Sequence, residues 1–346
     1  MRTPELSAEQ VESAVLVQAR AVVSARGMTT ESLLAEVQEG RRFEPAKHRQ
    51  LETEALLSRA RLSSVEARRL DRFSLLALAA VSEVLSSYPL SAEARWHCGL
   101  LVGNTMAGWT FTEPQLRVLY GQGAPVSPFM ATAWFPAAAQ GHVTLAMGMH
   151  GHSKTVTTDR CSGGQAIGWG LHRLLQGGQG PFVAGGSEAP VTPLVRAVLE
   201  DAGVDWVPWL SEAAGFLLLT RGVEASEGAC VLRAHTSFRR VRPERTEAGL
   251  AEFLEGMEGT PPLAAVVCDA RPASEDEQAL ETLVQRRLGA TVPRLWPCRT
   301  LGDSLGAGSG VAMALACELL ARESAARSVL VLSLGEQCVD VSWLHS

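Results

Sequence analysis

The chain has 346 residues, 46% of them hydrophobic, which is enough for one large core or two of ordinary size. A net charge of −6 gives no sign of nucleic-acid binding or of a polybasic membrane anchor. The start lacks a basic-then-apolar leader, and no apolar run approaches the roughly 20 residues that span a bilayer, so we expect a cytoplasmic protein. Seven cysteines and eight histidines are scattered without a CxxC pair, which predicts buried reduced thiols and no metal site.

Residues 1–90 are predicted to be a charged, helical segment. Ser7–Gln10 and Ser63–Glu66 have the spacing of a capping box, and LDRFSLLALAAVSEVL at 70–85 is predicted to be a buried helix. From about residue 96, short apolar runs alternate with Gly-rich turns and helices, as in an α/β sheet. The strand candidates are HCGLLVGN (97–104), PFVAGGSEA (181–189), GFLLLTRG (215–222), LAAVVCDA (263–270) and SVLVLSLG (328–335).

The sequence also contains a diverged internal repeat. Residues 161–186 run from a Gly-rich turn through a helix to an apolar strand, and residues 305–335 follow the same order. Small residues on the first turn of each helix allow close backbone approach. We therefore predict two similar halves, residues 1–236 and 237–346, with SFRRVRPERTEAG (237–249) as their connector.

From about Leu70 onward the chain resembles the β-ketoacyl synthases of the thiolase fold. The stretches LDRFSLLALAAVSEVL, CSGGQAIG, GGSEA and SLGAGSGVAMALA carry the resemblance and occur in the family's order. The resemblance implies an α/β fold in which two similar βα halves form an α-β-α-β-α layered arrangement.

The family's chemistry uses a cysteine at a helix N-terminus to take up the acyl chain, and two histidines for decarboxylation and oxyanion stabilisation. When CSGGQAIG is aligned on its QAIG end, Arg160 occupies the nucleophile position. The two histidine positions fall on Ala270 and Asp303. The resemblance thus implies that all three catalytic residues are absent.

Cys161 is one residue away from the nucleophile position. Successive helix residues point about 100° apart, so we favour a buried, inert thiol over a repurposed nucleophile. For Arg160 we favour a side chain that fills the vacated pocket and pairs with Asp303 or Asp159. The alternative is that it holds an anion such as a phosphopantetheine phosphate.

A second stretch, SPFMATAWFPAAAQGHVTLAMGMHGHS at 127–153, is similar to the chain-length factors of type II polyketide synthases. That resemblance implies a silent subunit that heterodimerises with an active ketosynthase, and an acyl carrier protein that brings the phosphopantetheine. The chain itself would then need no cofactor. Met130, Trp134 and Phe135 become candidates for the tunnel wall, and Val156, in SKTVTT at 153–158, a candidate for the subunit interface.

Two other functions stay open. The chain could be a condensing enzyme or malonyl decarboxylase that uses Cys161, or a ketosynthase-like scaffold that binds an acyl ligand or a carrier protein. The basic run of Arg239, Arg240, Arg242 and Arg245 could recruit an acidic carrier protein, although a solvated linker is the favoured interpretation.

Overall fold

The computed structural model describes residues 14–346 except 46, 48, 241, 242 and 258. Within these residues, ten strands form one mixed sheet in the order β3-β2-β4-β5-β1-β6-β10-β9-β7-β8. The first five strands along the chain are β1 (Val15–Ser24), β2 (Gly99–Gly103), β3 (Lys154–Val156), β4 (Phe182–Glu188) and β5 (Ala213–Arg221). The other five are β6 (Cys230–Arg239), β7 (Leu263–Asp269), β8 (Arg294–Leu295), β9 (Ser328–Leu334) and β10 (Cys338–His345).

The two halves of this sheet have the same topology. In the first, β2 is parallel to β3 and β4, and β5 runs antiparallel to β4 and β1. In the second, β7 is parallel to β8 and β9, and β10 runs antiparallel to β9 and β6. A short antiparallel contact between β1 and β6 joins them. The repeat therefore begins again at β6.

The topology places the junction between the halves at residues 222–229, between β5 and β6. The predicted boundary after residue 236 falls inside β6. It was predicted there because the basic composition of 237–249 is typical of a linker. Residues 237–239 are instead the end of β6, and residues 243–249 belong to α12.

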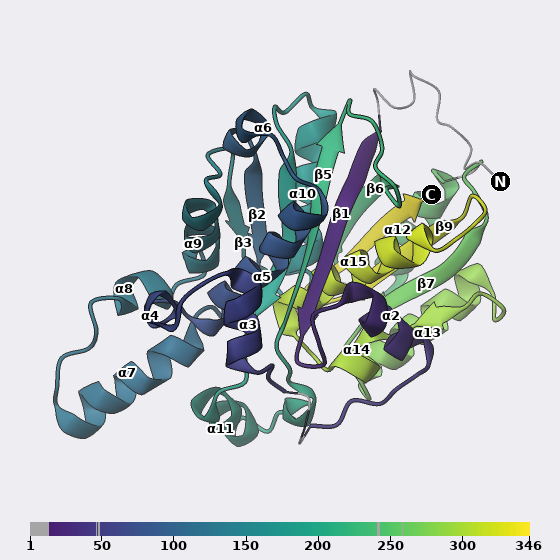
Figure 1. The fold of residues 1–346 in the computed structure, drawn as a ribbon. Helices are drawn as coiled ribbons and strands as arrows, with labels where there is room; N and C mark the ends of the chain where they lie inside the picture. Colours follow the sequence, from purple (N-terminus) through teal and green to yellow (C-terminus); the bar gives the residue numbers. More distant parts are fainter. Residues whose placement is uncertain (1–13, 46, 48, 241–242, 258) are drawn as a thin grey trace.

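The helices complete the α-β-α-β-α layers that the resemblance implied (Figure 1). The central pair packs in one core with the inner faces of both half-sheets: α10 (Ser162–Leu175) and α15 (Gly308–Ala321). The first half-sheet is covered on its outer face by α3 (Thr53–Ala60), α5 (Arg72–Ser87) and α9 (Ala138–Met147). The second is covered by α12 (Pro243–Glu255) and α13 (Glu275–Leu288).

The remaining helices connect these layers. They are α2 (Thr30–Gln38), α4 (Ser64–Ala67), α6 (Ala92–Trp96), α7 (Trp109–Gln122), α8 (Met130–Ala133), α11 (Pro193–Asp201), α14 (Pro297–Leu301), η1 (Val207–Trp209) and η2 (Leu305–Ala307). Helices α7 and α8 stand out from one side of the molecule (Figure 1). None of the helices in the described part of the chain is long and apolar enough to cross a membrane.

The central helices approach closely at their glycine-rich first turns. A Cβ built on Gly163 of α10 would lie 3.0 Å from the backbone nitrogen of Gly310 in α15. Larger residues there would force the two helices apart, so the prediction of close backbone approach is confirmed.

The prediction of a helical segment over 1–90 is wrong for residues 15–24, which form β1. This strand lies in the middle of the sheet: Val15, Val17 and Val22 face the central core, and Ala21 and Val23 face the outer one. A strand buried on both faces shows no alternation of apolar and polar residues, so its pattern does not distinguish it from a buried helix.

The other predicted elements in the described residues are confirmed. The five strand candidates are β2, β4, β5, β7 and β9, and the apolar stretch at 70–85 belongs to α5, which Asp71 caps. Ser63 and Glu66 form the predicted capping box, although the helix that they begin is only the short α4. The candidate box at Ser7–Gln10 lies outside the described residues.

Candidate functional site

Arg160 lies in the turn between β3 and α10, with 1% of its surface exposed. Its carbonyl oxygen accepts a hydrogen bond from the Ser309 hydroxyl in α15 at 3.1 Å. The same hydroxyl accepts from the Gly164 N–H at 2.7 Å. The first turns of both central helices therefore fix the backbone of Arg160.

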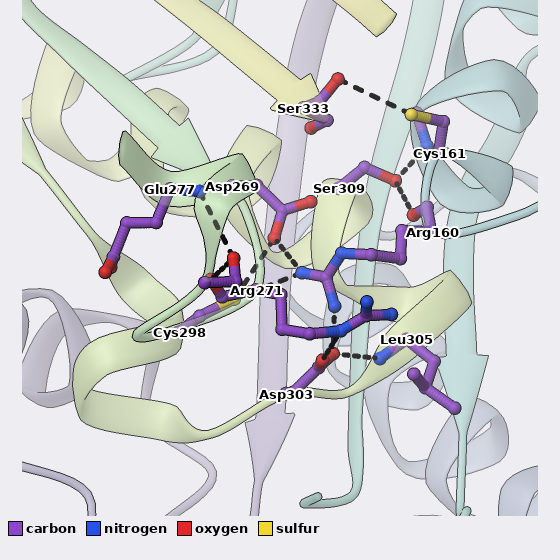
Figure 2. A network of polar contacts seen from close by, with 12 residues as sticks. Arg160, Cys161, Asp269, Arg271, Glu277, Cys298, Asp303, Leu305, Ser309 and Ser333 are labelled. Atoms are coloured by element: carbon purple, nitrogen blue, oxygen red, sulfur yellow. Dashed lines mark hydrogen bonds and ion pairs between the residues drawn. The ribbon is translucent and has the colours of Figure 1, made fainter. Parts of the chain in front are cut away.

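The guanidinium of Arg160 lies between two buried aspartates (Figure 2). Its Nη1 donates to Oδ1 of Asp303, and its Nη2 donates to Oδ1 of Asp269 at 3.1 Å. Burial alone would lower the pKa of Arg160, but the charges of Asp303 and Asp269 outweigh it and raise this pKa well above its usual value. Arg160 is thus a fixed cation whose charge is met by carboxylates of the same chain.

Of the two partners predicted for Arg160, the structure shows Asp303 and not Asp159. The Asp159 carboxylate accepts instead from the backbone N–H groups of Cys161, Gln337 and Cys338, at 2.8 to 3.0 Å. It fixes the turn between β9 and β10 against the start of α10.

The backbone of Asp303 holds its side chain in place. Its N–H donates to the carbonyl of Trp209 at 2.7 Å, and its carbonyl accepts from Ser211 at 2.9 Å. Its Oδ1 also accepts from the N–H of Leu305 at 2.9 Å. Leu305 has a φ of +44°, in the left-handed region that only a well-supported non-glycine residue adopts. The carboxylate is therefore held by a rigid turn.

Ala270 was predicted to lie at one of the family's two histidine positions. In the structure it is the preceding residue, Asp269, that contacts Arg160. Ala270 is completely buried in the outer core beneath α12 and α13, whereas Asp269 at the end of β7 meets the guanidinium. Burial raises the pKa of Asp269, although Arg160 opposes that shift.

Asp269 was not predicted from the sequence. A carboxylate that ends an otherwise apolar strand needs a buried partner, and this is the signal that could have revealed it.

Two further residues that the sequence analysis missed complete what we call the Arg160 cluster, which comprises Arg160, Asp269, Arg271, Cys298 and Asp303. The Cys298 thiol donates to Oδ1 of Asp269 at 3.1 Å. Arg271 lies with Nε 3.6 Å from Oδ2 of Asp303 and Nη2 2.5 Å from Oε1 of Glu336.

Arg271 also covers the cluster from outside. Its guanidinium lies 4.1 Å from the ring centroid of Trp206, and its side chain is 12% exposed. The cluster therefore contains two guanidiniums and two carboxylates, and Arg271 also pairs with Glu336 outside it.

The Cys161 thiol points away from this cluster (Figure 2). It is completely buried, and its Sγ lies 3.5 Å from the carbonyl oxygen of Ser333 and 3.6 Å from that of Cys338. Burial raises the pKa of Cys161 well above its usual value, and the nearby carboxylates of Asp340 and Asp159 raise it further. The thiolate, which is the nucleophilic form of cysteine, is therefore strongly disfavoured.

Arg160 and Cys161 contact carboxylates, hydroxyls, a thiol and backbone groups. Within the described residues, the hydrogen bonds and ion pairs of Arg160 and Cys161 reach no histidine. The guanidiniums of Arg160 and Arg271 both face carboxylates of the same chain, which compete with any oxyanion for these cations.

The predicted wall and interface residues lie elsewhere, on the side of the molecule formed by α8, α9 and β3. Trp134 is 52% exposed, Met130 is half-buried, and Phe135 packs partly against the outer core. Val156 lies half-buried in β3, the strand at one end of the sheet order. β3 is an edge strand, because β2 is its only neighbour in the sheet of the described residues.

The basic run is only partly described. Arg240 donates from Nη2 to Asp276 at 2.5 Å and from Nη1 to the carbonyl of Gly335 at 3.0 Å, and Arg239 is exposed. Arg242 and the side chain of Arg245 lie outside the described residues. The recruitment of a carrier protein by this run stays a prediction.

Residues 36–230 match the family described as "Beta-ketoacyl synthase, N-terminal domain". The chain is 26% identical over 266 residues to a polyketide beta-ketoacyl synthase 2 of Streptomyces cyaneus, covering 65% of this chain and 62% of that protein. It is 27% identical over 206 residues to the tetracenomycin polyketide synthase ketoacyl synthase beta subunit of Streptomyces glaucescens, covering 55% and 49%. The matched region thus spans less than two thirds of each relative.

Solved structures match over nearly the whole chain. A chain of the ishigamide ketosynthase/chain length factor superposes with a TM-score of 0.80 at 18% identity, covering 96% of this chain and 99% of that one. A chain of AntDE:AntF, a type II PKS acyl-carrier protein in complex with its ketosynthase, gives 0.77 at 20% identity with the same coverage. These likenesses confirm the thiolase-like fold.

Proposed function

Since the chain belongs to the β-ketoacyl synthase family, we propose that it is a subunit without condensing activity of its own, which pairs with an active ketosynthase. In this pair it forms part of the wall of the acyl tunnel, as a chain-length factor does. The observation that carries the proposal is the buried contact of Arg160 with Asp303 and Asp269.

The Arg160 cluster favours loss of catalysis over altered catalysis. Condensation needs a thiolate at the nucleophile position and groups that stabilise an enolate. Here the nucleophile position carries a guanidinium, its charge is compensated by two carboxylates, and the neighbouring Cys161 thiol has a raised pKa. A protein that used Cys161 would have to expose a completely buried sulfur and form its thiolate beside Asp159 and Asp340.

The edge of the sheet favours pairing with another subunit. β3 is three residues long and ends the sheet of the described residues, so one side of its backbone is open there to a strand of a partner. Large apolar side chains lie exposed on the elements beside it: Trp134 after α8, Leu145 in α9 and Trp169 in α10, at 52%, 83% and 39% exposure. Exposed apolar residues on adjoining elements are typical of a protein interface.

The acyl chain would reach the pair on an acyl carrier protein, whose phosphopantetheine arm is the only prosthetic group that the reaction needs. This chain would then require no cofactor or metal, and it would work in the cytoplasm beside its partner. The carrier-binding scaffold remains the second candidate, because the exposed β3 edge serves a homodimer equally well.

Four reconstitutions with malonyl-loaded carrier protein test the proposal: one uses the chain alone, and three pair it with a ketosynthase that has an intact nucleophile or, in the last, a removed one. The chain alone should form no condensed product, and the pair should. The pair with Cys161→Ala should be as active as the unmodified pair, whereas removal of the ketosynthase's own nucleophile should abolish product. Activity of the chain alone, or loss of product on Cys161→Ala in an assembled pair, would refute a silent subunit. A stable homodimer that binds no ketosynthase would favour the scaffold.

A further inference from the structure

The outer helices α12 and α13 enclose an open cavity of about 570 Å³ that takes no part in the Arg160 cluster. Its apolar lining comes from Leu280 and Leu283 of α13 and from Leu334 at the end of β9. Its polar lining includes Thr246 of α12 and Arg286 of α13. The volume lies in the range of about 300–1,000 Å³ that is usual for small-molecule sites.

Thr246 is the unusual member of this lining. Thr246 is only 8% exposed, and its hydroxyl has no hydrogen-bond partner among the residues that the structure describes. Leaving a buried hydroxyl unpaired costs about 1–3 kcal/mol, so such groups almost always find a partner. A polar atom of a molecule in the cavity would supply it.

The charges around the cavity leave one cation unmatched. Arg240 is paired with Asp276, and Glu247 is paired with Arg287 at 3.1 Å. Arg286 is exposed and makes no ion pair among the described residues. The cavity therefore combines an apolar floor, an unpaired hydroxyl and one positive charge without a counter-ion.

We propose that this cavity binds a small amphipathic anion, an aliphatic carboxylate. Its acid group pairs with Arg286 and hydrogen bonds to the Thr246 hydroxyl, and its hydrocarbon chain lies on Leu280, Leu283 and Leu334. The proposal does not depend on the proposed function, because the cavity lies on the outer face of the second half-sheet and shares no residue with the Arg160 cluster.

Calorimetric titration of the full chain with octanoate tests the site, with 1-octanol as a ligand of the same chain length without charge. We expect saturable one-to-one binding of octanoate and at least tenfold weaker binding of 1-octanol. Arg286→Glu, which removes the cation, and Leu283→Trp, which fills the floor, should each weaken octanoate binding at least tenfold. Thr246→Val should weaken it less.

Arg68→Glu is the matched control, since Arg68 is an exposed arginine outside the cavity. Its octanoate affinity should equal that of the unmodified chain, and circular dichroism melting should show that all variants remain folded. Absence of saturable octanoate binding would overturn the proposal. So would equal affinity in the unmodified chain, Arg286→Glu and Leu283→Trp, or equal affinity for 1-octanol.

Discussion

Arg160 and Asp303, 143 positions apart in the chain, form a salt bridge in which each side chain is at most 1% exposed. One residue precedes a central helix of the first half, and the other lies in the turn before the corresponding helix of the second. The pair therefore joins the two halves of the repeat beside the N-terminal ends of their central helices.

The first prediction concerns this contact. Arg160→Met keeps much of the side-chain volume but leaves the Asp269 and Asp303 carboxylates buried without their main cation. Removing one partner of a buried ion pair typically costs about 3–5 kcal/mol, and we expect a loss of that size in the free energy of unfolding, measured with urea.

Arg196→Met serves as the matched control, because Arg196 pairs with Glu200 on the surface of α11. Exposed pairs of this spacing are worth about 0.5 kcal/mol or less. The double variant Arg160→Met with Asp303→Asn should lose less than the sum of the two single variants. If Arg160→Met is no more destabilising than Arg196→Met, the cluster does not hold the halves together.

Much of the fold could be predicted from the sequence, because several elements have unambiguous local patterns. Five apolar runs bounded by glycine predicted five strands, and the repeat around α10 and α15 predicted two halves. β1 was predicted to be helical, because it is buried on both faces and so lacks the alternation that identifies a strand. β6, β8 and β10 were also not among the strand candidates. The junction was misplaced because the exposed, basic end of β6 has the composition of a linker.

The residues of the candidate site could be predicted only where the alignment of a sequence motif fixes a position. Arg160 and Asp303 were found by that register, and their pairing was one of two alternatives. Asp269, Arg271 and Cys298 were not found, because their proximity depends on where β7 and α14 end in space. Residues adjacent along a strand point to opposite faces, so an error of one position exchanges a core alanine for a cluster aspartate.

The second prediction concerns pH. Burial raises the pKa of Asp340 in β10 to about 8, and within the described part of the chain Oδ2 of this carboxyl has no hydrogen-bond partner. A carboxyl with a raised pKa holds its proton in the folded state, so the folded state loses stability as the pH rises from about 4 to about 8. Asp340→Asn, which is neutral throughout, should remove that part of the pH dependence.

Urea unfolding at pH 5, 6.5 and 8 measures the effect. The stability of Asp340→Asn relative to the unmodified chain should increase steadily with pH across this series. Asp201→Asn changes an exposed aspartate in α11 and should leave the profile unchanged. A parallel profile for Asp340→Asn would mean that the Asp340 carboxyl is ionised in the folded protein.

The third prediction concerns the edge strand. If β3 pairs with a strand of the ketosynthase, Val156→Pro should separate the subunits, since proline removes a backbone donor and disfavours a central strand position. Size-exclusion chromatography of the co-expressed pair measures this. The matched comparison uses aspartate, because a proline at Val198 would break α11. Val198 is an apolar position that is 58% exposed. Val156→Asp should dissociate the pair and Val198→Asp should not. Co-elution of both Val156 variants would exclude β3 from the interface.

The last prediction concerns Met130, Trp134 and Phe135. Shrinking a residue of the tunnel wall opens volume for the acyl chain, whereas shrinking a core residue leaves a cavity that costs about 2–5 kcal/mol. Trp134 is 52% exposed in the chain alone, so Trp134→Ala should barely change the urea stability of the isolated chain. Phe135 packs partly on the outer core, and Phe135→Ala should lower that stability more. Met130 is half-buried and should fall between them.

In the reconstituted pair, Trp134→Ala should give longer products with assembly intact, and mass spectrometry of the released chains measures the shift. Tyr120→Ala removes an aromatic residue of α7 that is 83% exposed, and it should leave product length unchanged. The two residues differ in their place: the Trp134 carbonyl accepts from the N–H of Gly108 at 3.0 Å, which fixes the backbone of Trp134 beside the start of α7, whereas Tyr120 lies near the end of that helix. Unchanged product length with Trp134→Ala in an intact pair would remove this residue from the tunnel wall, and loss of the complex would assign it to the subunit interface instead.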